Sequence, residues 1–108
     1  MKVTLDVENT ITVRNRKKHM DPFEPNNSLT MVGVLTDQGV CQTFPFDHAE
    51  IDSNADYHKH VQWFLDEATV LIMHNAAHDL LWLWECGFKY DGPVFDTMLA
   101  AYIVQRGI

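Results

Sequence analysis

Four consecutive apolar residues, Val70-Leu71-Ile72-Met73, constrain the fold of this 108-residue chain more than any other feature. A short apolar run without polar alternation is typical of a strand that is covered on both faces. Segments with apolar residues at helical spacing flank the run, over residues 57–68 and 80–84. The sequence therefore predicts an α/β domain in which helices pack on a sheet.

Three further strands are expected before this run. Residues 2–7, 29–35 and 40–46 are rich in apolar and β-branched side chains. The turn sequence Thr36-Asp37-Gln38-Gly39 favours an antiparallel hairpin between the second and third of them. Residues 9–27 are polar and contain two prolines, so we expect mostly loop there. The first half of the chain thus predicts a three-strand meander.

The second half alternates helices with strands. Ser53 or Asn54 is expected to cap a helix before the apolar run, and residues 76–86 are expected to form a second helix. The buried side of this second helix is predicted to hold Leu80, Leu83 and Trp84. Trp82 points elsewhere at helical period, so it is expected to be exposed or to face a further part of the domain.

A short strand at residues 94–95 and a final helix capped by Asp96 complete the predicted order. Three strands followed by strand–helix units predict a mixed sheet with helices on its faces. The final helix stops near residue 105 with no closing element after it. We therefore expect the chain to be part of a domain, truncated at its C-terminus.

The net charge excludes some classes of function. The net charge is −7, which argues against a protein that coats nucleic acid through a broad basic surface. It is compatible with an enzyme whose carboxylates bind divalent cations. Arg14, Arg16, Lys17 and Lys18 form the one basic cluster. This cluster is interpreted either as a solvated loop or as a phosphate-contacting loop beside an active site.

Asp6 and Glu8 are two residues apart at the end of the first strand, so their side chains point to the same side. Two carboxylates in one space repel each other unless a proton or a cation intervenes. A hard divalent ion with oxygen ligands is the usual partner. The alternative is that both carboxylates are exposed and unpaired.

A second acidic position follows the apolar strand, in the segment His74-Asn75-Ala76-Ala77-His78-Asp79. Asp79 is placed in the first turn of a helix. If the apolar strand lies beside the first strand, Asp79 faces Asp6 and Glu8, and three carboxylates would suit two-metal phosphoryl transfer. The alternative is that Asp79 only complements the helix dipole.

Taken together, these segments resemble the DEDD exonucleases, which share a ribonuclease-H-like fold. Asp-Val-Glu at residues 6–8 resembles their first motif, and the segment that ends at Asp79 resembles their second. Residues 96–102 are similar to the stretch that follows in bacterial polymerase I and phage family A polymerases. Residues 71–107 resemble a phage or cyanophage DNA polymerase, so the likeness implies a proofreading 3′–5′ exonuclease domain.

The resemblance implies a role for each motif residue. Asp6 would bridge two Mg²⁺ or Mn²⁺ ions, Glu8 would bind the first ion, and Asp79 would hold the second. Asn75 would lie near the scissile nucleotide or brace the turn of the second motif. Ile11 would contact the terminal base.

His78 stands where the family usually has an aromatic residue, and a histidine can still stack or donate a hydrogen bond. The partners implied are the 3′ end of a single-stranded DNA and the remainder of a DNA polymerase chain. No membrane partner is expected, because no long apolar run is present. The two cysteines lack ligand spacing, so reduced thiols and a cytoplasmic location are expected, in the host cell if a phage encodes the protein.

The family's third motif, a Tyr or His followed four residues later by an Asp, is absent from the chain. Residues 1–108 are thus predicted to be a partial exonuclease domain. Two alternatives stay open: a catalytically inactive fragment or split-gene piece that acts as a binding module, and a stand-alone exonuclease of the same superfamily that acts on RNA.

Overall fold

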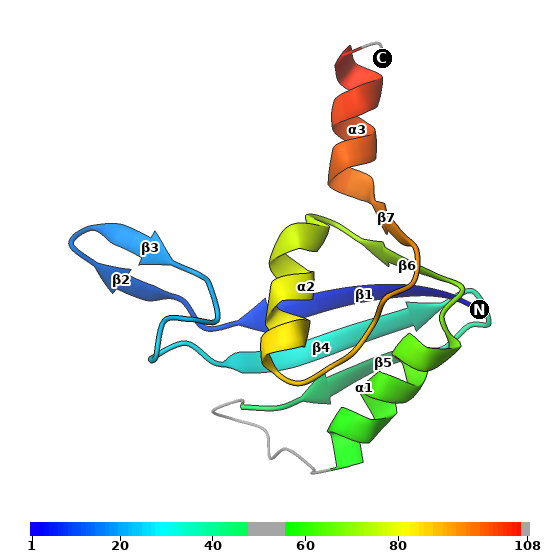
Figure 1. Cartoon of the computed structure of the whole chain (residues 1–108), viewed down its shortest axis with the longest axis horizontal. Coiled ribbons are helices and arrows are strands. Elements are labelled where there is room, and N and C mark those ends of the chain that lie inside the picture. The colour runs from blue at the N-terminus through cyan, green and yellow to red at the C-terminus, as the bar shows by residue number, and fades with distance from the viewer. Residues whose placement is uncertain (48–55, 107–108) are drawn as a thin grey trace.

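The structure, a computed structural model, describes residues 1–47 and 56–106 (Figure 1). In chain order its elements are β1 (Lys2–Asn9), β2 (Thr12–Arg14), β3 (Lys17–His19), β4 (Leu29–Thr36), β5 (Cys41–Pro45), α1 (Asp56–Glu67), β6 (Val70–Met73), α2 (Ala76–Glu85), β7 (Val94–Asp96) and α3 (Thr97–Arg106). The mixed α/β architecture is the one predicted, and it is consistent with a ribonuclease-H-like exonuclease fold. The predicted caps Ser53 and Asn54 lie outside the described residues.

The main sheet has five strands in the order β5-β4-β1-β6-β7. β4 pairs antiparallel with both β1 and β5, which confirms the predicted meander. β6 is parallel to β1 and to β7. The first strand and the apolar strand are therefore neighbours, which is the condition under which Asp79 is expected to face Asp6 and Glu8. The loop after β6 opens next to the later part of β1.

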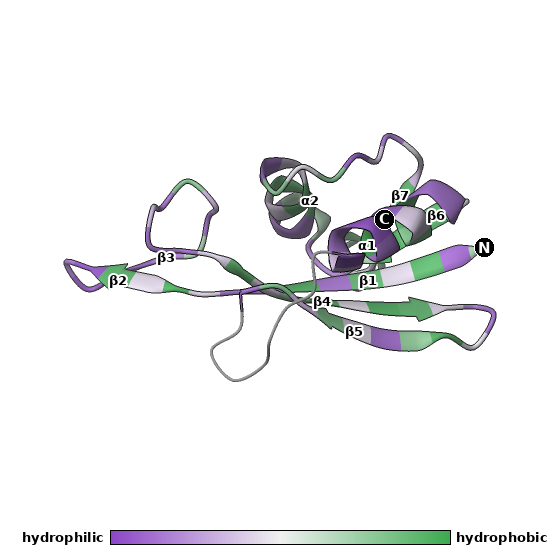
Figure 2. Ribbon diagram, turned by 90° about the horizontal axis from the view of Figure 1, so that it is seen from below, coloured by the Kyte–Doolittle hydropathy of each residue, from purple (hydrophilic) through white to green (hydrophobic). Residues whose placement is uncertain are grey.

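The core lies between one face of this sheet and the helices. Val3, Leu5 and Val7 alternate along β1 and are buried, whereas Asp6 and Glu8 between and beyond them are exposed. Figure 2 shows α1 and α2 above the same face of the sheet. Buried side chains from α1 complete the core at Val61, Phe64 and Leu65. Full burial of one such side chain stabilises the folded state by roughly 1.5–3 kcal/mol. Because the buried side chains of β1 belong to the same core, this burial also holds β1 in place.

The burial of β6 differs from the prediction. Leu71 and Met73 are buried, but Val70 and Ile72 are only partly buried. The expectation that both faces of this strand are covered is therefore wrong. The neighbouring strands protect its edges, and α1 and α2 cover one of its faces.

The buried side of α2 was also mispredicted. Trp84 is 55% exposed, whereas Trp82 is 2% exposed and its indole Nε1 donates to the carbonyl oxygen of Met20 at 2.9 Å. Asp79 belongs to the buried stripe of this helix, although it is not apolar. Because the buried face of α2 includes the carboxylate of Asp79, it is rotated away from the face that the apolar residues alone predict. This rotation explains why Trp82 and not Trp84 is buried.

The segment predicted as loop contains a second, two-stranded sheet. β2 and β3 form an antiparallel hairpin that extends from the body of the molecule (Figure 1). The two residues of its turn, Asn15 and Arg16, have φ values of 51° and 65°. Two central residues with positive φ are the requirement of a type I′ hairpin turn, in which Arg is an unusual occupant.

The final helix, α3, has no buried residue. Its apolar side chains Met98, Leu99, Tyr102, Ile103 and Val104 are exposed. Among the described helices, none combines the length and hydropathy needed to cross a membrane.

Candidate active site

Asp6 and Glu8 lie on the open face of the sheet, opposite the face that α1 and α2 cover (Figure 2). In the β1–β4 pair the residue across from Asp6 is Gly33. A Cβ atom at this glycine would meet only the Asp6 carbonyl oxygen, at 3.9 Å, so space beside the Asp6 side chain is free. Within the described residues, neither carboxylate makes a hydrogen bond or an ion pair, and both are available to a ligand.

Asp79 reaches the edge of β1 from α2. Its Oδ2 accepts a hydrogen bond from the backbone N–H of Val7 at 3.2 Å, and the residue is 3% exposed. β6 pairs only with residues 2–4 of β1, so at Val7 the side of β1 opposite β4 has no strand beside it. The Asp79 carboxylate satisfies this N–H, and it thereby lies next to the residue that follows Asp6.

The environment of Asp79 disfavours its charged form. Burial raises its pKa from the ordinary value of 3.8 to about 7, while the hydrogen bond from Val7 N–H opposes the shift. The negative charges of Asp6 and Asp96 are smaller contributions to the same increase in pKa. A divalent cation between Asp6 and Asp79 would reverse this balance, because it favours two ionised carboxylates.

The carboxylate oxygens of this site are the type of ligand that binds a hard cation, but there are fewer of them than a closed metal site needs. Carboxylate oxygens are the ligands that Mg²⁺ and Mn²⁺ prefer. Yet nowhere in residues 1–47 and 56–106 are three His, Cys, Asp or Glu side chains grouped closely enough to hold a metal ion. Asp79 accepts the backbone N–H of Val7, the residue after Asp6, and the charge of Asp6 raises the pKa of Asp79. Glu8 lies two residues further along β1, on the same face as Asp6.

Asn75 and His78 lie at the start of α2. Asn75 has a left-handed backbone with φ 65°, its side chain makes no cap hydrogen bond, and it is exposed. His78 is partly buried, and its Nε2 lies 3.0 Å from Oδ1 of Asn9. His78 thus connects the helix of Asp79 to the end of the strand of Asp6.

Asp96 holds the starts of two helices. Its carboxylate accepts the backbone N–H groups of Asn75 and Ala76 at the start of α2, and that of Met98 in α3. The hydrogen bond from Ala76, the largest of these effects, helps to hold its pKa below the ordinary range. The predicted capping role is confirmed, and these bonds occupy the oxygens that a metal would need.

Ile11 lies between β1 and β2 and is 53% exposed. Asn9, for which the sequence predicts no role, and Trp82 fix this region. The Nδ2 of Asn9 donates to the carbonyl oxygens of Thr10 and Met20, and the indole of Trp82 donates to the same Met20 oxygen. An Asn at the point where a strand enters a polar loop is a signal for such side-chain to backbone bonds.

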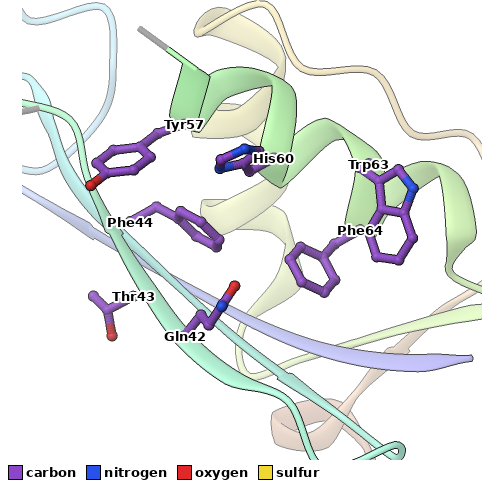
Figure 3. A pocket seen from close by; sticks show the side chains of 7 residues that line it. All are labelled: Gln42, Thr43, Phe44, Tyr57, His60, Trp63 and Phe64. Carbon is purple, nitrogen blue, oxygen red and sulfur yellow. The ribbon is translucent and has the colours of Figure 1, made fainter. Parts of the chain in front are cut away.

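A separate hollow of about 560 Å³ lies between β5 and α1 (Figure 3). Its lining residues are Gln42, Thr43, Phe44, Tyr57, His60, Trp63 and Phe64. Phe44 pairs with Val32, which in turn pairs with Val7, so the hollow opens on the helix-covered side of the sheet. Asp6 points to the other side, and the hollow is therefore not part of the carboxylate site.

Comparison with known proteins identifies the family. The sequence profile of the 3′–5′ exonuclease family matches residues 20–107, which include Asn75, His78 and Asp79. The matched range begins after Asp6, Glu8 and Ile11. No curated protein matches the chain. Because the profile covers most of its length, the chain belongs to the 3′–5′ exonuclease family.

Proposed function

We propose that this chain hydrolyses the terminal phosphodiester bond at the 3′ end of a single-stranded DNA with the help of Mg²⁺ or Mn²⁺. The observation that carries the proposal is the position of Asp79, whose carboxylate lies at the free edge of β1 and interacts with the charge of Asp6. Exonucleases of this type generally use divalent metals. Asp6 and Asp79 would hold the ion, with Glu8 as a further ligand.

The residues of the chain prepare this site. The N–H of Val7 orients Asp79, and Gly33 leaves the space beside Asp6 free. Bound divalent ions would supply the attacking hydroxide and stabilise the leaving 3′ oxygen. Until an ion binds, Asp79 is partly protonated near pH 7, because its pKa is raised to about 7, chiefly by burial.

Three residues are proposed to contact the substrate. Asn75 lies near the scissile nucleotide, supported by its exposed side chain at the start of the Asp79 helix. Ile11 offers an exposed apolar surface to the terminal base. His78 contributes through Asn9, which it holds by a hydrogen bond, or through stacking.

The larger context is part of the proposal. We propose that residues 1–108 form part of an exonuclease domain that proofreads for a DNA polymerase, of phage origin. The exposed apolar side chains of α3 support an additional packing partner, because this helix buries no residue in the described structure. Two free cysteines agree with a cytoplasmic setting.

One observation favours a second candidate, a module that binds nucleic acid without cleaving it. Over the described residues, no three His, Cys, Asp or Glu side chains form a group that could hold a metal ion. A two-carboxylate site would hold an ion weakly and would not complete a two-metal arrangement.

The test is nuclease activity on a 5′-labelled single-stranded oligonucleotide with Mn²⁺. Wild type is expected to produce a ladder that shortens from the 3′ end, and Asp79→Asn and Asp6→Asn are expected to remove it. Asp91→Asn, which changes an exposed carboxylate elsewhere, is the matched control. Absence of metal-dependent trimming by wild type would favour the binding module, and equal trimming by all variants would remove these carboxylates from the reaction.

A further inference from the structure

The β2–β3 hairpin carries an unusual share of the positive charge of an acidic protein. Four of the eight Lys and Arg residues lie between positions 14 and 18, while the net charge of the chain is −7. The hairpin extends from the body of the molecule beyond the end of β1 (Figure 1). Solvation alone does not require such a concentration of cations on a projecting element.

The hairpin has an inner and an outer face. Strand register places Arg14 opposite Lys17, and Val13 opposite Lys18. Arg14 forms an ion pair with Glu24, which is 8% exposed, and this pair fastens the inner face to the following loop. The outer face presents Val13, which is 63% exposed, together with Lys18.

Three cations remain without a protein partner. In the described parts of the chain, no hydrogen bond or ion pair involves the side chains of Arg16, Lys17 or Lys18. Arg16 occupies the turn with φ 65°, where glycine would be easier to accommodate. The turn therefore places a guanidinium at the tip of the hairpin, where it is free to bind an anion.

The base of the hairpin is fixed against the carboxylate site. The carbonyl oxygen of Met20 accepts hydrogen bonds from Asn9 and from the buried Trp82 of α2. Thr10 and Ser28 close the base of the hairpin. The backbone N–H of Thr10 donates to the carbonyl oxygen of Ser28, and the backbone N–H of Ser28 donates to Thr10 Oγ1.

Asn9 also connects the hairpin to α2, because its side chain forms a hydrogen bond with His78, one residue before Asp79. The hairpin is thus an arm attached to both elements that carry the carboxylates.

The exposed side chains beside the cations define the ligand. Ile11, Val13, Met20 and Phe23 expose about half of their surface or more, so apolar groups are interspersed with positive charge. Single-stranded nucleic acid offers the complementary pattern of phosphates and unstacked base faces. An anionic membrane surface offers phosphates without unstacked base faces, so it matches this pattern less well.

We propose that the β2–β3 hairpin is a binding arm for the phosphodiester backbone of a single-stranded nucleic acid, and that it positions the strand whose 3′ end lies at Asp6 and Asp79. The position of the 3′ end depends on the proposed exonuclease function, but binding by the arm does not. Arg16, Lys17 and Lys18 contact phosphates, and Val13 and Ile11 contact bases. The arm supplies local attraction that the net charge of the protein does not.

The test is binding of a fluorescent oligothymidylate by anisotropy in EDTA, where no cleavage occurs. The arm variant replaces Arg16, Lys17 and Lys18 by Ser. The control variant replaces three cations elsewhere by Ser, namely Lys2, Lys59 and Lys89. Both variants lower the net charge by the same amount, so long-range repulsion is matched and only the position of the lost charges differs.

The arm variant is expected to bind at least tenfold more weakly than wild type at low salt, and the control less than threefold. The slope of log affinity against log salt should fall by about 2 for the arm variant, since each phosphate contact on a single strand contributes about 0.7. Equal losses in both variants, no binding by wild type, or binding of wild type to phosphatidylserine vesicles but not to the oligonucleotide would overturn the proposal. Binding without cleavage in Mn²⁺ would leave the arm intact and reject the exonuclease activity.

Discussion

Replacement of Asp79 by Asn is expected to stabilise the metal-free protein at alkaline pH. The folded carboxyl has a pKa of about 7 against an ordinary value of 3.8. At about 1.4 kcal/mol for each pKa unit, ionising it above pH 7 costs the folded state up to about 4 kcal/mol relative to the unfolded chain. Asn keeps an oxygen that can accept the Val7 N–H and carries no charge, so we expect a gain of roughly 2–4 kcal/mol at pH 8.

The pH dependence follows from the direction of the shift. Between pH 3.8 and 7 the folded state binds more protons at Asp79 than the unfolded state does, so the contribution of this group to stability falls as pH rises. Below the lower value the penalty disappears, and wild type and Asp79→Asn should converge.

Urea unfolding in EDTA from pH 4 to pH 8 measures this difference, with Asp91→Asn as the control for removal of one exposed charge. The expected result is a gap between wild type and Asp79→Asn that widens with pH, and no such gap for Asp91→Asn. The reasoning is refuted if Asp79→Asn is less stable than wild type at pH 8, or if the gap does not change with pH.

Three further changes test the packing and the charges around the site. Asp6→Ala/Glu8→Ala should leave the free energy of unfolding in EDTA unchanged or raise it, because Asp6 disfavours ionised Asp79; a loss above about 1 kcal/mol in urea unfolding would show a structural role instead. Trp82→Phe should lose about 1–2 kcal/mol in the same assay through a cavity and a lost hydrogen bond, while Trp84→Phe should stay within about 0.5 kcal/mol; similar losses would contradict the assigned burial. The stabilising effect of the Asp96 carboxylate is present above pH 3.8 and is lost as pH falls through its lowered folded pKa. Asp96→Asn should therefore lower the melting temperature at pH 7 and flatten its acid decline, whereas an unchanged profile would speak against the double cap.

The strand order was predictable because its signals are local. An apolar run between helical stripes and a Gly-terminated turn before the third strand identify the elements, and general rules then favour a mixed sheet. The position of Asp6 beside the Asp79 helix followed once the first strand and the apolar strand were taken as neighbours. The sequence leaves that neighbour relation as a condition, because the two residues are 73 positions apart and neither motif specifies the pairing alone.

The wrong predictions for the buried face of α2 and for the β2–β3 hairpin have a common origin. In both places, tertiary contacts stabilise polar groups where the local sequence pattern does not predict them. Burial of Asp79 shifts the buried face of α2 toward Trp82, which apolar periodicity does not reveal. The sequence predicts loop at the hairpin because its strands are short and charged, and because Arg16 stands where a type I′ turn favours glycine. Hydrogen bonds from Asn9 and Trp82 to Met20 hold the base of this hairpin, and no local pattern encodes them.

Calorimetric titration of Mn²⁺ into wild type, Asp6→Asn, Asp79→Asn and Asp91→Asn at pH 7.5 tests the central claim most directly, namely that Asp6 and Asp79 share a cation. We expect saturable binding by wild type and by Asp91→Asn, and affinity at least tenfold weaker in each of the other two variants. Wild-type heats that do not saturate, or equal affinity in all four proteins, would contradict the claim that these two carboxylates form the metal site of an exonuclease.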